Sequence, residues 1–203
     1  METGSENYTR LNIASETAAL LLLAAQNNEC PVGAILFDEN ITFSVPPKRN
    51  NEHTMLILSK LSKRDKKVSK GSCLSSSLKG AQQLLKNCSM VFVISDFRCK
   101  NYEKDLSVLA QKHDVVAIQI IDNNDSELPK IGLISATDAE SNVHQFLPTN
   151  SNEFSHNWHE NNKKSLEQWK YMCRRHGIIP LVISTTDDPT VRLSRFFASW
   201  GRK

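Results

Sequence analysis

Apolar residues in this chain are grouped into segments that predict an alternation of helices and strands. Residues 10–26 are rich in good helix formers and apolar on most sides, which is typical of a helix buried against a sheet. The nearly continuous apolar runs 90–94, 115–121 and 178–183 are typical of parallel strands covered by helices on both faces. A short helix around Leu106 separates the first two runs. This order predicts a mostly parallel, doubly wound α/β sheet with right-handed crossovers.

Two β-hairpins are expected beside this sheet. Residues 32–37 and 41–45 flank a polar turn and predict a hairpin whose second strand stops at Pro46. The segments 131–136 and 143–147 alternate between apolar and polar residues, which favours a small antiparallel hairpin over another buried strand. We expect this second hairpin to lie outside the main sheet.

The remaining patterns are helical or polar. Helical spacing of apolar residues predicts further helices at 52–61, 73–86, 163–176 and from Pro189 onward, after the capping residue Asp188. The polar segment between the second hairpin and the third of these helices, residues 150–162, is predicted to be a loop. The basic stretch 60–70 lacks the interleaved aromatic residues of a nucleic-acid surface and is interpreted as a solvated loop.

Composition places the chain among ordinary globular proteins. Its 203 residues are 39% hydrophobic and 23% charged, enough for one domain with a sizeable core. A net charge of +3 is too small to require a nucleic acid or an acidic membrane as partner. The five cysteines are odd in number and show no Cys-x-x-Cys spacing, which favours a reducing cytoplasm. The longest apolar run is too short to span a membrane.

Several motifs together resemble the C-terminal half of the domain-of-unknown-function-58 family. In the family's order they are Val93-Ile-Ser-Asp-Phe97, His113-Asp-Val-Val116, Glu127-Leu-Pro129, Thr137-Asp-Ala-Glu140 and Ser184-Thr-Thr-Asp187. The resemblance covers nearly the whole chain. It implies a von Willebrand factor A-like, Rossmann-like sheet, mostly parallel and flanked by helices, in which ligands gather at the carboxyl ends of the strands.

The resemblance also implies a metal-ion-dependent adhesion site for magnesium. Ser72 matches the hydroxyl position of this site, and Asp96 matches its acidic ligand after the following strand. Short oxygen-bearing side chains suit the octahedral coordination of Mg²⁺. The family's first ligand loop, Asp-x-Ser-x-Ser, does not occur in this sequence. The expected site is therefore incomplete.

The chain resembles a family member that begins just after this missing motif. Its opening residues, Met1 to Ser5, match the segment that follows the motif, so we interpret Met1 as internal to the family's domain. The strand that carries the motif is central in the family, between the first hairpin and the strand at 90–94. Without it, two strand edges are left unpaired. We expect direct pairing of the two sheet halves, a homodimer through the exposed edges, or poor solubility.

Two other kinds of site compete with the magnesium interpretation. His156 and His159, together with Cys173 and His176, supply four potential zinc ligands in two pairs. The second pair falls on an apolar helical stripe, where a core cysteine is the ordinary explanation.

A hydrolase built on Ser95 and Asp96 with His113 is disfavoured, because His113 precedes a strand and no Gly-x-Ser-x-Gly elbow occurs. His113 is interpreted as a structural or capping residue.

The sequence therefore favours a non-enzymatic protein-interaction domain over an enzyme. The family resemblance implies a role beside a MoxR-type AAA+ ATPase in assembling or maturing protein complexes. A truncated remnant that keeps only the fold is the alternative. A hydrolase or a zinc enzyme is the third hypothesis and the least supported.

Overall fold

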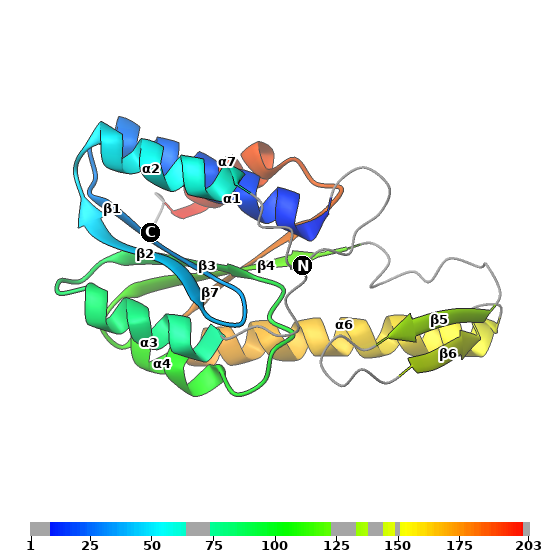
Figure 1. The fold of residues 1–203 in the computed structure, drawn as a ribbon. Coiled ribbons are helices and arrows are strands. Elements are labelled where there is room, and N and C mark those ends of the chain that lie inside the picture. Colours follow the sequence, from blue (N-terminus) through cyan, green and yellow to red (C-terminus); the bar gives the residue numbers. More distant parts are fainter. Residues whose placement is uncertain (1–8, 64–73, 123–132, 138–143, 149–150, 201–203) are drawn as a thin grey trace.

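The described part of the molecule combines parallel and antiparallel strands with helices (Figure 1). The computed structural model describes residues 9–63, 74–122, 133–137, 144–148 and 151–200. Within these ranges the strands form a three-stranded parallel sheet and two antiparallel hairpins. This is the mixed α/β architecture that the apolar pattern predicts.

The parallel sheet has the strand order β3-β4-β7. Its strands are β3 (Met90–Ser95), β4 (Asp114–Ile121) and β7 (Ile179–Ser184), and α4 (Glu103–Ala110) connects the first two. β4 lies in the middle, and its residues Val115 and Ile118 are 1% and 0% exposed. A strand covered on both faces needs apolar side chains at successive positions, which explains the unbroken apolar run in the sequence.

Helices cover this sheet on both faces (Figure 1). One face is covered by α1 (Arg10–Asn27) and α7 (Pro189–Trp200), where Ile13 belongs to the same buried cluster as Ile118. The other face is covered by α3 (Leu74–Leu84), α4 and α6 (Asn152–Arg175), where Leu106 belongs to the cluster of Val115. None of the helices in the described ranges is long and apolar enough to cross a membrane.

The first hairpin pairs β1 (Val32–Phe37) with β2 (Ile41–Lys48). β2 continues through Pro46 and Pro47, although the sequence predicted its end there. The register shifts between Val32 and Ala34, so the prolines lie at an irregularity where the ladder does not need their missing N–H groups. The backbones of the two strands approach each other closely at Gly33. A Cβ at that position would lie only 2.8 Å from the backbone nitrogen of Pro47, so glycine suits it.

The hairpin and the parallel sheet share no hydrogen-bonded strand pair. Among the described strands, β1 is paired only with β2, and β3 only with β4. The expected direct pairing of the two sheet halves is therefore not seen in these ranges. The hairpin instead packs through Val32 on Leu22 of α1 and on Ile57 of α2 (Asn51–Ser62).

The second hairpin pairs β5 (Leu133–Thr137) with β6 (His144–Pro148) in antiparallel orientation. It forms a separate sheet, as the sequence predicted. Figure 1 shows it well away from the parallel sheet.

α6 begins at Asn152, so the prediction of a loop at 150–162 is wrong. Ser151 caps this helix, because its Oγ accepts a hydrogen bond from the N–H of Phe154 at 3.2 Å. Phe154 and Trp158 stand one turn apart with ring centroids separated by 6.2 Å. Local capping and a single aromatic pair support this helical extension, although it carries few apolar residues.

Truncating a leucine in the core should destabilise the fold much more than truncating one on the surface. Leu106 of α4 is 0% exposed, and Leu56 of α2 is 45% exposed. We expect Leu106→Ala to lower the free energy of unfolding by about 3 kcal/mol, because it removes buried methyl groups and leaves a cavity. The matched control Leu56→Ala should change it by no more than about 0.5 kcal/mol. Urea denaturation measures both, and equal losses would contradict the described core.

Candidate functional site

The carboxyl ends of the three parallel strands meet at one edge of the sheet. Ser95 at the end of β3 lies opposite Gln119 of β4, and Ile121 of β4 lies opposite Ser184 of β7. Loops that leave this edge are the usual place for ligands in open α/β sheets. Acidic and hydroxyl side chains follow all three strands here, namely Asp96, Asp122, Thr185 and Thr186. We describe this carboxyl edge as the candidate site.

Asp96 is half-buried and is held between two buried neighbours. Ser95 is 3% exposed, and its Oγ accepts a hydrogen bond from the N–H of Phe97 at 3.2 Å. The backbone oxygen of Asp96 accepts a hydrogen bond from Nε2 of Gln119 at 3.1 Å, and its Oδ1 accepts one from the N–H of Arg98 at 3.4 Å. The loop therefore presents the Asp96 carboxylate from a fixed backbone.

Phe97 anchors this loop in the core. Its φ of 53° lies in the left-handed region, which a bulky residue rarely adopts without compensation. The compensation comes from packing, because the Phe97 ring lies 5.4 Å from Tyr102 and 5.1 Å from Trp169, centroid to centroid. Burial raises the pKa of Tyr102 well above its ordinary value, so this phenol stays neutral. The aromatic cluster fixes the position of Asp96 indirectly.

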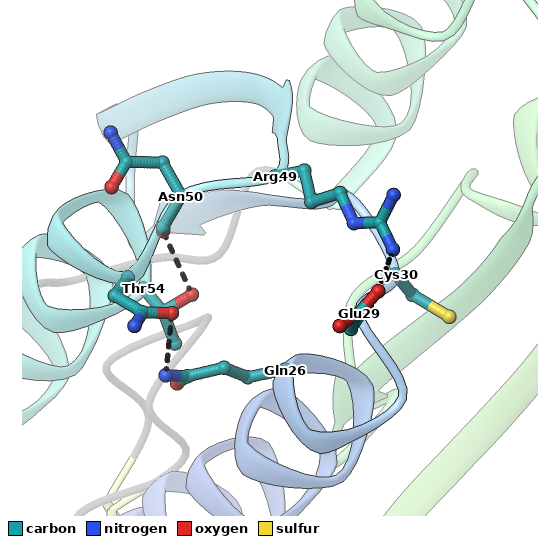
Figure 2. A pocket seen from close by; sticks show the side chains of 7 residues that line it. Gln26, Glu29, Cys30, Arg49, Asn50 and Thr54 are labelled. Atoms are coloured by element: carbon teal, nitrogen blue, oxygen red, sulfur yellow. Dashed lines mark hydrogen bonds and ion pairs between the residues drawn. The ribbon is translucent and has the colours of Figure 1, made fainter.

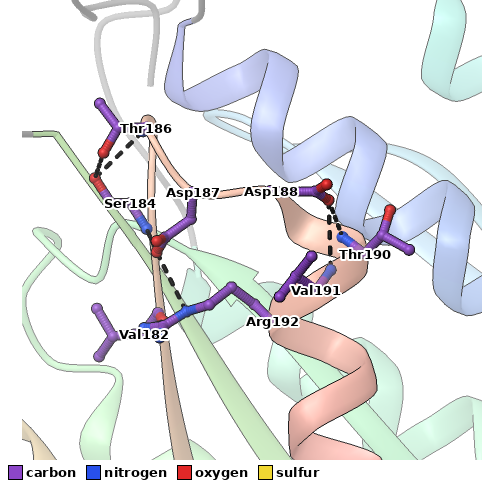
Figure 3. Close-up of polar contacts among 8 residues, drawn as sticks. All are labelled: Val182, Ser184, Thr186, Asp187, Asp188, Thr190, Val191 and Arg192. Atoms are coloured by element: carbon purple, nitrogen blue, oxygen red, sulfur yellow. Dashed lines mark hydrogen bonds and ion pairs between the residues drawn. The ribbon is translucent and has the colours of Figure 1, made fainter.

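The loop between β7 and α7 is organised by its own two acidic residues (Figure 3). Oδ2 of Asp187 accepts a hydrogen bond from the N–H of Ser184 at 2.8 Å and lies 3.2 Å from Nε of Arg192. Oδ1 of Asp188 accepts a hydrogen bond from the N–H of Thr190 at 2.7 Å and caps α7, as the sequence predicted. Both acidic residues therefore stabilise this loop and the start of α7.

Sequence reasoning missed two buried polar residues, Asp122 and Arg10. Asp122 directly follows β4 and is 1% exposed, while Arg10 begins α1 and is 4% exposed. The end of β7 is held beside β4 here, because the N–H of Thr185 donates a hydrogen bond to the carbonyl of Ile121 at 2.9 Å. The position of Asp122 after an apolar run, like that of Asp96, was the signal that could have found it.

The described residues do not by themselves fit a magnesium site. Ser72 lies outside the described residues. Asp96 is described, but the described ranges contain no group of three or more acidic, histidine or cysteine residues that could hold a metal ion. Fewer than three such ligands are a poor match for a cation that requires six oxygen ligands.

The two proposed zinc pairs are not brought together. His156 and His159 lie on α6, and Cys173 lies near its other end. From His159 to Cys173 the helix rises by about 20 Å. His176 caps the helix and its Nδ1 lies 3.1 Å from Oγ of Ser107. Within one chain, these four side chains cannot reach a common ion.

His113 is also separated from Ser95 and Asp96. It precedes β4, whose first residue, Asp114, lies opposite Met90 at the start of β3, whereas Ser95 ends β3. At about 3.3 Å per residue, this places His113 more than about 15 Å from Ser95 along the strands. His113 is 7% exposed, and its N–H donates to the carbonyl of Leu109 at 3.1 Å.

A concave region, separate from the carboxyl edge, lies where α1 ends and α2 begins (Figure 2). Its volume is about 330 Å³. Many of its polar groups already bind one another: Nε2 of Gln26 donates to Oδ1 of Asn51 at 3.0 Å, and Arg49 pairs with Glu29. This ion pair is largely exposed, and it leaves less charge available for a ligand.

Comparison with known proteins places the chain in a family. The sequence model of a protein family described as "protein of unknown function DUF58" matches residues 1–168. The chain belongs to this family. Similar curated proteins include an uncharacterised protein of Mycobacterium bovis, which is 29% identical over 146 residues, or 70% of this chain and 46% of that protein. An uncharacterised protein of Mycobacterium tuberculosis matches to the same extent.

A shorter match is closer in sequence. An uncharacterised protein of Mycobacterium avium is 42% identical over 55 residues, which are 27% of this chain and 32% of that protein. The DUF58 chain thus spans about a third to a half of the length of these curated relatives.

Cys173 should resist alkylation over a wide pH range. It is 0% exposed, and burial raises its pKa from 9.0 to about 12. At pH 10 the Cys173 thiol would therefore be only about 1% thiolate, the form that reacts. We expect iodoacetamide to modify the exposed Cys30 more than about tenfold faster than Cys173 at both pH 8 and pH 10. Peptide mass spectrometry measures the two rates, and comparable rates would show that Cys173 is not buried.

Proposed function

We propose that this DUF58 chain is a non-enzymatic protein-interaction domain whose partner contacts the carboxyl edge at Asp96. The supporting observation is the way in which Asp96 is presented. It is half-buried, lies between the buried Ser95 and Phe97, and sits on a backbone stabilised by an aromatic cluster. A polar side chain held in this way on a loop of a rigid scaffold is typical of a binding residue.

The partner that we propose is a MoxR-type AAA+ ATPase, as the resemblance to von Willebrand factor A-like family members implies. In those members, magnesium would bind a carboxylate of the partner. Because the described residues do not fit a complete magnesium site, we propose that Asp96 contacts a basic side chain of the partner directly. Such a charged contact adds specificity and speeds association.

Removing the charge of Asp96 should weaken this interaction. Asp96→Asn keeps an oxygen that can accept from the N–H of Arg98, so the loop geometry is preserved. Asp114→Asn is the matched control, because it removes one charge from an exposed residue at the start of β4, at the end of the sheet opposite the carboxyl edge. We expect Asp96→Asn to raise the Kd for a purified MoxR-type ATPase by about tenfold or more, and the control to leave it unchanged.

Calorimetric titration with magnesium and with EDTA completes the experiment. We expect the same Kd under both conditions. Equal binding by wild type and Asp96→Asn would overturn the role of Asp96. A requirement for magnesium with the nucleotide-free ATPase would contradict a direct, metal-independent contact at Asp96.

A further inference from the structure

One peptide group at the carboxyl edge is held at both of its ends by side chains. This group joins Asp96 to Phe97, so it contains the carbonyl of the first residue and the N–H of the second. The N–H donates to Oγ of Ser95 at 3.2 Å, and the carbonyl accepts from Nε2 of Gln119 at 3.1 Å. Ser95 and Gln119 lie opposite each other on β3 and β4. A cross-strand pair of side chains therefore binds both polar groups of a single peptide unit.

The same peptide group determines the backbone conformation of Phe97. Phe97 has a φ of 53°, which is unfavourable for a residue with a large side chain. Rotating the peptide group by about half a turn would bring Phe97 into the extended region that such residues prefer. The rotation would also turn the N–H away from Ser95 and the carbonyl away from Gln119. The two hydrogen bonds thus oppose a rotation that the backbone of Phe97 favours.

Gln119 is an unexpected residue at its position in β4. Its neighbours Ile118 and Ile120 are apolar and are 0% and 1% exposed. Gln119 is half-buried, and its Oε1 is buried without a hydrogen-bond partner among the described residues. Burying an unpaired amide oxygen is unfavourable, so an apolar side chain would suit this strand better. The donation to Asp96, which only the NH2 end of the amide can make, is the interaction that offsets this cost.

We infer that Ser95 and Gln119 together form a clamp on the peptide group between Asp96 and Phe97, and that this clamp holds the Asp96 loop in its binding conformation. Without the clamp, the peptide group would exchange between two orientations. A partner that binds only one of them would then bind more weakly, because part of the population is not competent to bind. The inference rests on the proposed function for the role of Asp96, but the clamp itself is a property of the chain alone.

Three clamp variants each remove one of the two hydrogen bonds. Gln119→Leu and Gln119→Glu remove the donor to Asp96, since neither side chain carries an N–H, and Ser95→Ala removes the acceptor for Phe97. Leucine is typical of the apolar strand, and glutamate keeps the shape of glutamine. Thermal unfolding identifies any variant that does not fold, and the remaining variants carry the test.

Gln82→Leu is the matched control for Gln119→Leu. Gln82 is also half-buried, and its Nε2 donates to the backbone oxygen of Asp105 at 3.2 Å. The control therefore removes the same kind of hydrogen bond by the same substitution. It does so between α3 and α4, away from the peptide group of Asp96 and Phe97.

The first readout is nuclear magnetic resonance of the chain alone. A strong nuclear Overhauser effect between the N–H and the Hα of one residue marks a positive φ, because the two hydrogens are then close together. We expect this signal for Phe97 in the wild type and in Gln82→Leu, and its loss or weakening in the clamp variants. Exchange of the Phe97 N–H with solvent should be about tenfold or more faster in the clamp variants, because its hydrogen bond to Ser95 is lost.

The second readout is binding to the purified MoxR-type ATPase. We expect the clamp variants to raise the Kd by about fivefold or more, and Gln82→Leu to leave it unchanged. Retention of the positive φ and of slow exchange at Phe97 in the folded clamp variants would overturn the clamp. Rotation of the peptide group with an unchanged Kd would overturn its role in binding. If the wild type itself does not bind the ATPase, the proposed function fails, and the signals of the chain alone still decide whether the clamp exists.

Discussion

Apolar packing of α1 and α3 holds together two sheets that share no strand pairing in the described ranges. The hairpin contributes Val32 to a cluster with Leu22 of α1, and the parallel sheet contributes Ile118 to a cluster with Ile13 of the same helix. Sheets are ordinarily continuous because backbone hydrogen bonds join neighbouring strands. Among the described residues, side-chain burial, which is non-directional, holds the hairpin in place. The arrangement therefore depends on two helices that each bridge the gap.

Structural hydrogen bonds and contacts determine which polar residues remain available to bind a partner. Asp187 and Asp188 are used to join β7 to α7, and His176 ends α6 beside Ser107. Asp96 differs from them, because the buried Phe97 and Ser95 fix its backbone while the carboxylate remains partly accessible. The aromatic contacts of Phe97 offset an unfavourable backbone conformation, which links the core directly to the candidate site.

The sequence was sufficient for the elements with a clear apolar period. The buried run of β4 and the capped helix that starts at Pro189 were predicted within a residue or two. The first half of α6 was missed, because a mostly polar helix away from the core has no apolar stripe to reveal it. The extension of β2 through Pro46 was missed because the register shift that accommodates it is a property of the strand pair.

The candidate site was less predictable, because burial of polar groups depends on tertiary structure. Asp96 was identified through the family resemblance, whereas Asp122 and Arg10, which are 1% and 4% exposed, were not singled out from the sequence.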